Sequence, residues 1–365
     1  MAEPRKILLT SVNNLGDCVA FLPVAAAVRA AWPGARTAML TGGAGAGAAR
    51  LTSLIDEFIE LPPSRHRPPR WALLKLAGRI RRERFDLGIM ASGDSSFVAA
   101  LLWMGGARER VGFDDCSGSF LLTKRVPGGG VEHEARRNLR LAAALGLPSD
   151  PLRPPCRIPP PLAEEARTEL ARNGATPEGD PPLVLIHPGA SIPARRWPAA
   201  RFAALAARLK REGRARPVLV EGPAERGLAE DIARMSGAPL PVLRPAGVEL
   251  LGAIVAQCRL FIGHSSGPFH VACLAGTPTV SLWGDTDPAL WGPAWETERH
   301  LLVRSPLPCA PCERWDERTH RIARGRNAAA GAGAPPCGEC LAAITEQSVW
   351  EAVMRQLEVI GHRGV

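Results

Sequence analysis

Residues 6–31 have the sequence KILLTSVNNLGDCVAFLPVAAAVRAA, and this stretch determines the expected class of fold. The apolar run from Lys6 to Val12 has the composition of a buried strand, and the alanine-rich run from Phe21 to Ala31 predicts a helix. Between them, residues 14–17 (NLGD) form a short polar turn. A strand, a turn and a helix in this order are the repeating unit of a parallel α/β sheet.

The same alternation continues on both sides of a proline-rich segment. Residues 148–162, PSDPLRPPCRIPPPL, contain seven prolines and predict an extended linker, since proline cannot continue a helix or a central strand. Further strands are expected at 37–40, 87–91, 183–187, 217–220, 260–262 and 279–282, and further helices at 199–211, 250–258 and 269–274. We therefore expect an N-terminal Rossmann-like domain at 1–160, a C-terminal one at 161–345 and a C-terminal helix at 346–365.

The composition limits the classes of protein that the chain can belong to. A length of 365 residues favours two domains, and 46% hydrophobic residues argue against wholesale disorder. No apolar run is long enough to span a membrane or to form a signal-peptide core, so we expect a cytoplasmic protein. The net charge of +9 comes from 41 arginines and only 4 lysines, which is typical of a GC-rich coding bias. It still indicates an anionic partner.

The first candidate site is Asp17, which follows the first strand. The carboxyl ends of parallel strands and the free N–H groups of the next helix are where α/β sheets bind ligands. A carboxylate there can act as a general base toward an acceptor hydroxyl. The alternative is that Asp17 only caps the helix, which position alone favours.

Two more candidate sites follow strands in the second half of the chain. The sequence from His187 to Ser191 leads to Arg195 and Arg196, whose guanidinium groups suit a diphosphate. Glu225 lies just after the strand at 217–220, where a carboxylate can accept both ribose hydroxyls. A solvated arginine pair and a glutamate that merely favours a helix dipole are the alternatives.

The fourth candidate site is the segment 263–270, GHSSGPFH, between a strand and a helix. Its small residues let the backbone approach a phosphate, and the helix offers its N–H groups. The sequence lacks the Gly-x-Ser-x-Gly elbow of a serine hydrolase, so Ser265 and Ser266 are not expected to act as nucleophiles.

Together these segments resemble glycosyltransferase family 9, the heptosyltransferases of lipopolysaccharide assembly. Four stretches carry the resemblance, at 8–37 (LLTSVNNLGDCVAFLPVAAAVRAAWPGART), 183–209 (LVLIHPGASIPARRWPAARFAALAARL), 218–233 (VLVEGPAERGLAEDIA) and 262–293 (IGHSSGPFHVACLAGTPTVSLWGDTDPALWGP). The resemblance implies a GT-B fold, in which two Rossmann-like doubly wound domains face each other across a cleft. The N-terminal domain would then hold the acceptor and the C-terminal domain the nucleotide sugar. It also implies inverting transfer from ADP-heptose without a catalytic metal.

The resemblance also assigns roles to single residues. It makes Asp17 the base, and it places Ser191 and Arg195 at the donor phosphates, with Arg196 beside them, and Glu225 at the ribose. The donor diphosphate and sugar would be surrounded by Ser265, Ser266, Gly267 and His270. Two positions depart from the family pattern, since Arg195 replaces the usual lysine and Ser265 replaces the usual aspartate. Because a hydroxyl cannot replace the contacts of a carboxylate, Ser265 leaves the identity of the donor sugar open.

The nine cysteines form two groups. Five are single residues, which fits reduced thiols in a cytosolic protein. The other four form two C-x2-C pairs separated by 24 residues inside an expected insertion at 305–340: Cys309, Cys312, Cys337 and Cys340. This spacing predicts a structural zinc or iron site, and some autotransporter-modifying heptosyltransferases resemble this chain in having a four-cysteine iron site. Four reduced thiols are the alternative.

The expected function is therefore transfer of a heptose from ADP-heptose to an anionic glycolipid such as the lipopolysaccharide core. Transfer of heptose or another sugar to a protein or a natural product remains open, and so does a non-catalytic homologue that only binds nucleotide sugar. A nucleic-acid partner is not expected, because the sequence has no recognised binding motif. Peripheral association with the inner face of the cytoplasmic membrane and a homo-oligomeric state are left open.

Overall fold

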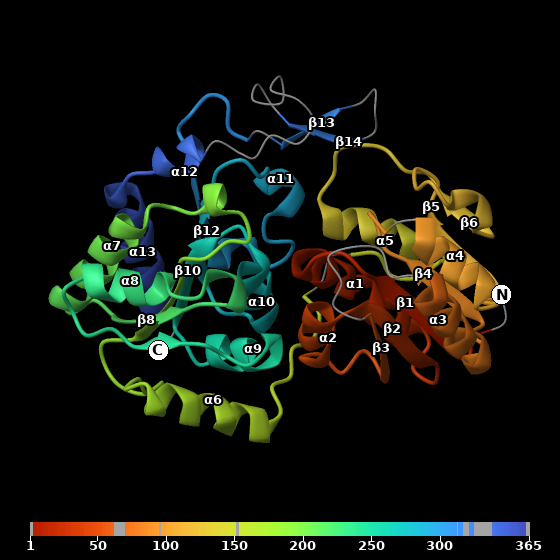
Figure 1. Cartoon of the computed structure of the whole chain (residues 1–365), viewed down its shortest axis with the longest axis horizontal. Coiled ribbons are helices and arrows are strands. Elements are labelled where there is room, and N and C mark those ends of the chain that lie inside the picture. The colour runs from red at the N-terminus through yellow and green to blue at the C-terminus, as the bar shows by residue number, and fades with distance from the viewer. Residues whose placement is uncertain are drawn as a thin grey trace. The chain divides into compact units, whose positions relative to one another are not determined.

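The computed structural model describes residues 3–61, 70–94, 96–150, 153–311, 313–316, 321–324 and 338–362. The chain divides into two compact units, 1–157 and 158–365 (Figure 1). Each unit contains one six-stranded parallel sheet with helices, so the predicted α/β class with two doubly wound sheets is confirmed. The acceptor and donor roles assigned to the two halves stay predictions.

The sheet of the first unit has the strand order β3-β2-β1-β4-β5-β6, with every pair parallel. Its strands are β1 (Lys6–Ser11), β2 (Arg36–Gly42), β3 (Glu57–Leu61), β4 (Leu87–Met90), β5 (Glu109–Phe113) and β6 (Lys124–Val126). Its helices are α1 (Leu15–Ala31), α2 (Gly43–Arg50), α3 (Arg70–Glu83), α4 (Ser96–Met104) and α5 (Glu134–Ala144), with a 3-10 turn η1 (Ser119–Leu121).

Strand β1 lies in the middle of this sheet, and successive side chains point to opposite faces. Leu8 packs in one core with Ala77 of α3 and Leu101 of α4. Ile7 and Leu9, which point the other way, are also fully buried. The helices group accordingly, because α1 contacts α2 and α5, whereas α3 contacts α4.

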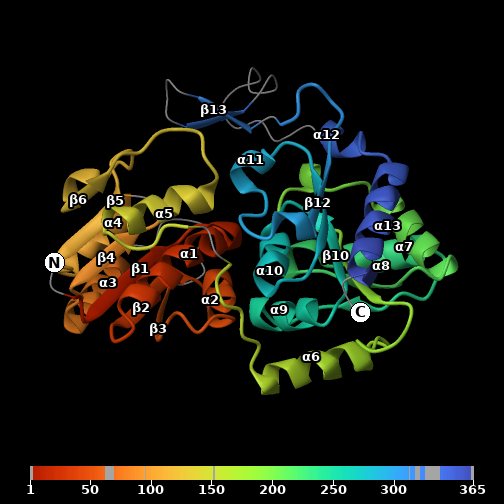
Figure 2. The same ribbon diagram turned by 180° about the vertical axis from the view of Figure 1, so that it is seen from behind.

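The sheet of the second unit has the order β12-β11-β10-β7-β8-β9 and is also parallel. Figure 2 shows two of its strands, β10 and β12. Its strands are β7 (Leu183–His187), β8 (Arg216–Val220), β9 (Val242–Leu243), β10 (Leu260–His264), β11 (Thr279–Trp283) and β12 (His300–Arg304). The pair β13 (Glu313–Asp316) and β14 (Arg321–Arg324) forms a separate antiparallel ladder.

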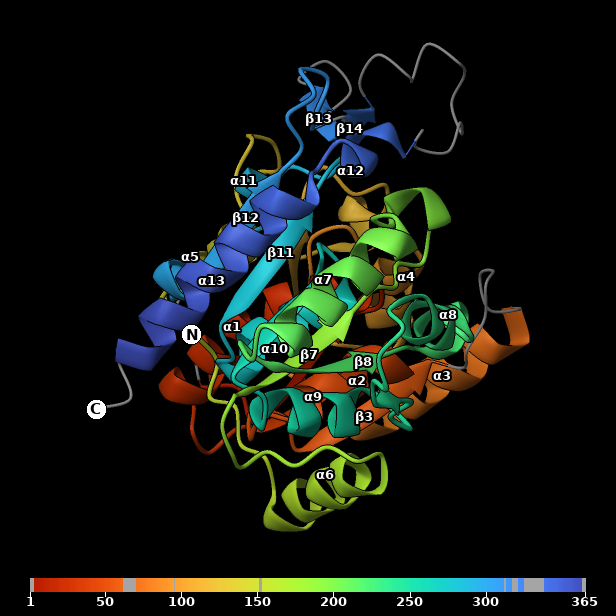
Figure 3. The ribbon, with the colours of Figure 1, turned by 90° about the vertical axis from the view of Figure 1, so that its left-hand side faces the viewer.

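The helices of the second unit are α6 (Pro160–Arg172), α7 (Ala199–Arg211), α8 (Leu228–Met235), α9 (Val248–Ala256), α10 (Gly267–Ala275), α11 (Pro288–Trp291), α12 (Glu339–Ala342) and α13 (Glu346–His362). Three 3-10 turns complete the list: η2 (Pro193–Arg195), η3 (Pro223–Glu225) and η4 (Thr297–Arg299). Helix α13 runs beside α7 (Figure 3). Trp350 of α13 lies under the Arg208 guanidinium of α7, and the Trp197 indole donates to the Ile344 carbonyl.

Two expectations about helix boundaries were wrong. Helix α1 begins at Leu15 and not at Phe21, because Asn14 adopts the extended N-cap conformation and the carboxylate of Asp17 accepts its backbone N–H. The proline-rich segment is not extended throughout, since α6 begins within it at Pro160. Prolines are tolerated in the first turn of a helix, where the missing N–H would have no intrahelical partner.

Within the described ranges, none of the helices combines the length and the apolar character needed to cross a bilayer. Much of the expected insertion at 305–340, including Cys312 and Cys337, lies outside the described residues.

Candidate functional site

Asp17 lies in the first turn of α1, directly beyond the carboxyl end of β1. Its carboxylate accepts a hydrogen bond from the Asn14 backbone N–H at 3.0 Å, so it does cap the helix. Burial raises the pKa of this half-buried carboxyl, and the hydrogen bonds from Asn14 lower it in part. A carboxyl with a raised pKa is a better proton acceptor than an exposed aspartate, so capping and proton transfer are compatible at this position.

Sequence reasoning missed a second carboxyl close to Asp17. Asp94 follows β4, the strand next to β1, and is 2% exposed. It accepts hydrogen bonds from the Thr10 hydroxyl at 2.7 Å and the Val12 backbone N–H at 3.0 Å. It therefore anchors the loop that carries Asp17. Burial raises the pKa of Asp94 to about 7, and the negative charge of Asp17 contributes to the increase.

A third carboxyl, Glu134, begins α5. Burial raises its pKa, hydrogen bonding from Ser92 and the charge of Arg137 lower it, and the charge of Asp17 raises it further. Three carboxyls thus interact at the carboxyl edge of the first sheet. Because they repel one another when ionised, their proton affinities are coupled.

The loop after β7 in the second unit is held in place by a buried histidine. The His264 side chain accepts the Trp197 backbone N–H at its Nε2 atom, at 2.7 Å, and its Nδ1 lies 3.1 Å from the Gly189 carbonyl oxygen. This arrangement requires a neutral ring with the proton on Nδ1. Burial lowers the pKa of His264 to about 4, so the ring stays neutral at physiological pH.

The two predicted phosphate-binding arginines both lie in this loop and both have protein partners. Arg195 donates from Nε to the buried carboxylate of Asp285 at 2.7 Å. Arg196 donates from Nε and Nη2 to the Ala190 carbonyl oxygen at 3.0 and 2.8 Å. Ser191 is exposed in the same loop. The arginines are thus oriented by the fold, and Asp285 is a residue that sequence reasoning did not assign to the site.

Two glutamates follow β8, and the structure separates their roles. Glu221 is 2% exposed and accepts hydrogen bonds from Arg244 and from the N–H groups of Gly227 and Ala229. Although burial raises its pKa, these bonds and the Arg244 charge hold it below the usual value. Glu221 is therefore a structural residue that shapes the loop.

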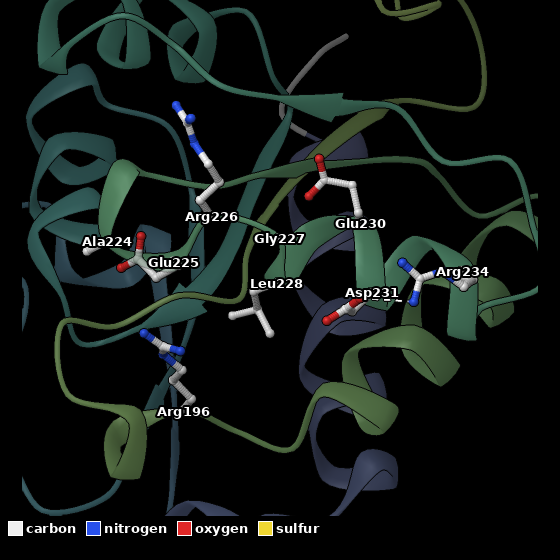
Figure 4. Close-up of a pocket in the computed structure, with 9 residues that line it drawn as sticks. All are labelled: Arg196, Ala224, Glu225, Arg226, Gly227, Leu228, Glu230, Asp231 and Arg234. Atoms are coloured by element: carbon white, nitrogen blue, oxygen red, sulfur yellow. Dashed lines mark ion pairs between the residues drawn. The ribbon is translucent and has the colours of Figure 1, made fainter.

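Glu225, the predicted ribose ligand, is half-buried beside the loop after β7. A Cβ atom added to Gly189 would come within 2.7 Å of its Cγ and Cδ atoms, so Glu225 packs directly on that glycine. It also lines a pocket of about 390 Å³. Figure 4 shows Arg196 and Glu225 on one side of this pocket and residues of α8 on the other. Two predicted donor residues, Arg196 and Glu225, are thus brought together.

The fourth predicted site is the start of α10, at the carboxyl end of β10. Ser265, Ser266, Gly267 and His270 are all half-buried there. Ser266 is the extended N-cap residue, and its hydroxyl donates to the His264 carbonyl oxygen at 3.4 Å rather than capping the helix. Pro268 has no N–H, and the Phe269 N–H donates to the Ser266 carbonyl oxygen at 3.0 Å, so it is the Gly267 N–H that this turn offers to a ligand. The positive end of the helix dipole also favours an anion there.

The four-cysteine prediction falls partly outside the described residues. Cys309 is half-buried and Cys340 is buried, whereas Cys312 and Cys337 are among the residues not described. In the described part of the chain, no three His, Cys, Asp or Glu side chains are grouped so as to hold a metal ion. The metal site therefore stays a prediction.

The described end of the cysteine segment packs on the loops that carry the predicted donor site. A Cβ on Gly284 would come within 2.6 Å of the Cys340 sulfur, and a Cβ on Gly338 would come within 3.3 Å of the Ala194 carbonyl oxygen. Gly284 precedes Asp285 and Ala194 precedes Arg195. Residues 338–340 therefore support both partners of the Arg195–Asp285 ion pair.

The comparisons with known proteins agree on one family. Residues 73–322 match the family described as glycosyltransferase family 9 (heptosyltransferase). Lipopolysaccharide heptosyltransferase 3 of Escherichia coli is 31% identical over 226 residues, which are 59% of this chain and 64% of that protein. Lipopolysaccharide heptosyltransferase 1 of Pseudomonas aeruginosa is 26% identical over 323 residues, covering 84% of this chain and 86% of the relative.

Two solved structures are similar in fold. The glycosyl transferase family 9 protein from Veillonella parvula has a TM-score of 0.78 at 21% identity and covers 97% of both chains. The E. coli heptosyltransferase WaaC with ADP-2-deoxy-2-fluoro heptose has a TM-score of 0.69 at 18% identity, covering 96% of this chain and 99% of that one. At these identities the likeness shows the fold alone.

Proposed function

The chain belongs to glycosyltransferase family 9, and we propose that it transfers a heptose from ADP-heptose to a hydroxyl of the lipopolysaccharide core. The observation that carries this proposal is the environment of Asp17, a half-buried carboxyl with a raised pKa at the carboxyl edge of the first sheet. The relatives whose names specify heptose transfer support the choice of sugar. The complex of WaaC with an ADP-heptose analogue supports the choice of donor.

In this mechanism Asp17 accepts the proton of the acceptor hydroxyl. The acceptor oxygen then forms a bond to the anomeric carbon of the heptose while the bond from that carbon to the diphosphate oxygen breaks. ADP leaves with the bonding electrons, and attack from the opposite side inverts the anomeric configuration. No step needs a divalent metal, because cationic and N–H groups of the chain can stabilise the leaving diphosphate.

The second unit supplies those groups. Arg195 and Arg196 direct positive charge to the loop after β7, and the start of α10 adds the Gly267 N–H and the positive end of the helix dipole. Ser191, Ser265 and His270 provide polar contacts near the same strand ends. Glu225 accepts the ribose hydroxyls, since its carboxylate borders the pocket and packs on Gly189.

Two features of the sequence motivate the alternatives to this function. Ser265 lacks the carboxylate that the family usually has at this position. This difference motivates two alternatives, transfer of a sugar other than heptose and a protein that binds the donor without turnover. The paired cysteines motivate a further alternative, in which the acceptor is a protein such as an autotransporter, or a natural product, instead of lipopolysaccharide.

A donor and acceptor panel tests the proposal. Purified protein is given ADP-heptose or other nucleotide sugars together with lipopolysaccharide core, protein and small-molecule acceptors, and products are identified by mass spectrometry. Turnover of ADP-heptose onto the core supports the proposal, and turnover only with another sugar rejects it. Donor binding without any product supports the non-catalytic alternative.

The matched control in this panel is Asp17→Asn, which keeps the shape of the side chain. A second experiment compares cell-surface glycans and glycoproteins from a strain lacking the gene. Heptose missing from the core confirms the acceptor, whereas an unchanged core with an altered glycoprotein selects the protein acceptor.

The metal prediction has its own measurement. Elemental analysis of protein purified without a histidine tag should find about one zinc or iron per chain if the four cysteines bind one ion. Trace metal far below one equivalent would reject the site and leave four reduced thiols.

A further inference from the structure

Four large apolar side chains project to solvent from a single helix layer of the first unit. Trp71 and Leu74 of α3 are 69% and 64% exposed, Trp103 of α4 is 55% exposed, and Phe120 of η1 is 76% exposed. Helix α4 contacts both α3 and η1, so the three elements are neighbours. Figure 1 shows α3 beside α4. We call this the α3–α4–η1 face.

Packing within the unit does not account for these side chains. Helix α3 already buries an inward face, where Ala77 and Ile80 join the core between the helices and the sheet. A surface helix normally turns polar residues outward from such a core. Trp71 and Leu74 instead give α3 a second apolar face, and α4 contains no charged residue at all. Exposed apolar side chains of this size on neighbouring elements are typical of an interaction surface.

The exposed charged side chains of α3 are basic. Lys75, Arg81 and Arg82 are exposed, and they share the outward face of α3 with Trp71 and Leu74, since positions three, four, seven and eleven apart align on a helix. The one acidic residue of α3, Glu83, is paired with Lys6. The outward face of this helix therefore combines indole and aliphatic groups with exposed cationic side chains.

We propose that the α3–α4–η1 face docks the protein on an anionic phospholipid surface. Tryptophan rings insert at the boundary between lipid headgroups and acyl chains, and arginine and lysine reach the anionic headgroups beside them. A second copy of the chain is disfavoured as the partner, because the same face of both copies would bring like charges together. The inference is independent of the sugar that the enzyme transfers.

Vesicle cosedimentation of the full chain tests the docking surface. Vesicles of phosphatidylcholine alone are compared with vesicles that also contain phosphatidylglycerol. We expect binding only to the mixed vesicles, weakened by salt. The double variant W71A/L74A should bind at least about ten-fold less tightly, because two large apolar groups no longer enter the interface. The variant K75E/R81E/R82E should lose the dependence on phosphatidylglycerol.

Met235→Ala in α8 is the matched control, because Met235 is 50% exposed in the other unit and should leave vesicle binding unchanged. Circular dichroism and turnover with a water-soluble, deacylated acceptor check that each variant is folded and active. Wild-type and W71A/L74A proteins that bind the mixed vesicles equally would overturn the proposal. A W71A/L74A variant that instead converts an oligomer to a monomer, with no vesicle binding by the wild type, would also overturn it and assign the face to self-association.

Discussion

Asp17→Asn separates proton acceptance from helix capping at the proposed base. Asparagine keeps an oxygen that can accept the Asn14 backbone N–H, which lies 3.0 Å from the carboxylate in the wild type. It cannot take a proton from the acceptor hydroxyl. Since general base catalysis contributes roughly 10²–10⁴-fold, kcat should fall by that factor while the midpoint of thermal unfolding changes little. The affinity for ADP should stay the same.

Asn14→Ala is the complementary variant. It removes the side chain of the N-cap residue, which costs about 1 kcal/mol of stability, but it leaves the Asp17 carboxylate in place. Because hydrogen bonding from Asn14 lowers the pKa of Asp17, its partial loss should move the acidic limb of the kcat/KM profile to higher pH. Asp17→Asn should abolish that limb instead of moving it.

Both variants are assayed by donor turnover across pH, with urea unfolding as the measure of stability. The role of Asp17 as the base is refuted if Asp17→Asn retains activity within about ten-fold of wild type, since a base contributes at least roughly a hundred-fold. It is equally refuted if the activity loss follows the fraction unfolded, because capping alone would then explain the effect.

Three further predictions concern the anchoring residues. The free energy of unfolding of the wild-type protein, relative to that of Asp94→Asn, should fall by about 1.4 kcal/mol for each pH unit between about 5 and 7. In that range the folded carboxyl, with a pKa of about 7, keeps its proton, whereas the unfolded one has lost it. The same pH dependence of urea unfolding in both proteins would contradict this. Gly189→Ala should displace Glu225 without unfolding the protein. ADP binding, measured by calorimetry, should weaken by about ten-fold, since a hydrogen bond to a charged group contributes roughly 1.5–3 kcal/mol. Unchanged affinity would remove Glu225 from the ribose site. Arg195→Gln should cost about 1.5–3 kcal/mol of stability, because the buried Asp285 carboxylate loses the hydrogen bond from that cation. Adding Asp285→Asn should restore stability but not ADP affinity, and recovery of both would mean that Arg195 has only a structural role.

The central elements of both sheets could be predicted from the sequence because they are apolar runs bounded by turn residues. The strand Leu183–His187 and the helix Ala199–Arg211 have the predicted bounds. The start of α1 could not be predicted, because Gly16 and Asp17 are poor helix formers. The structure shows that the helix has begun there, since the Asn14 N–H donates to the Asp17 carboxylate and the Cys18 N–H donates to the Asn14 carbonyl oxygen.

Candidate site residues were predictable where they directly follow a strand. Asp17, Arg195, Arg196 and Glu225 each follow a strand, and that position alone made them candidates. Asp94 lies near Asp17 because β4 pairs with β1. Its position in the turn Ser-Gly-Asp at 92–94, directly after a predicted strand, was a signal that could have identified it. Glu134 lies on a helix and had no comparable signal. The Arg195–Asp285 pair spans 90 residues and depends on the order of strands in the second sheet.

The contacts of residues 338–344 have a consequence for the order of events during synthesis. The loop that carries Arg195 is covered by Gly338, and Trp197 donates to the carbonyl of Ile344, almost 150 residues later. A nascent chain therefore cannot complete the loop after β7 until its C-terminal segment has left the ribosome. Truncation before that segment would leave a sheet able to form but a nucleotide-sugar site without its support.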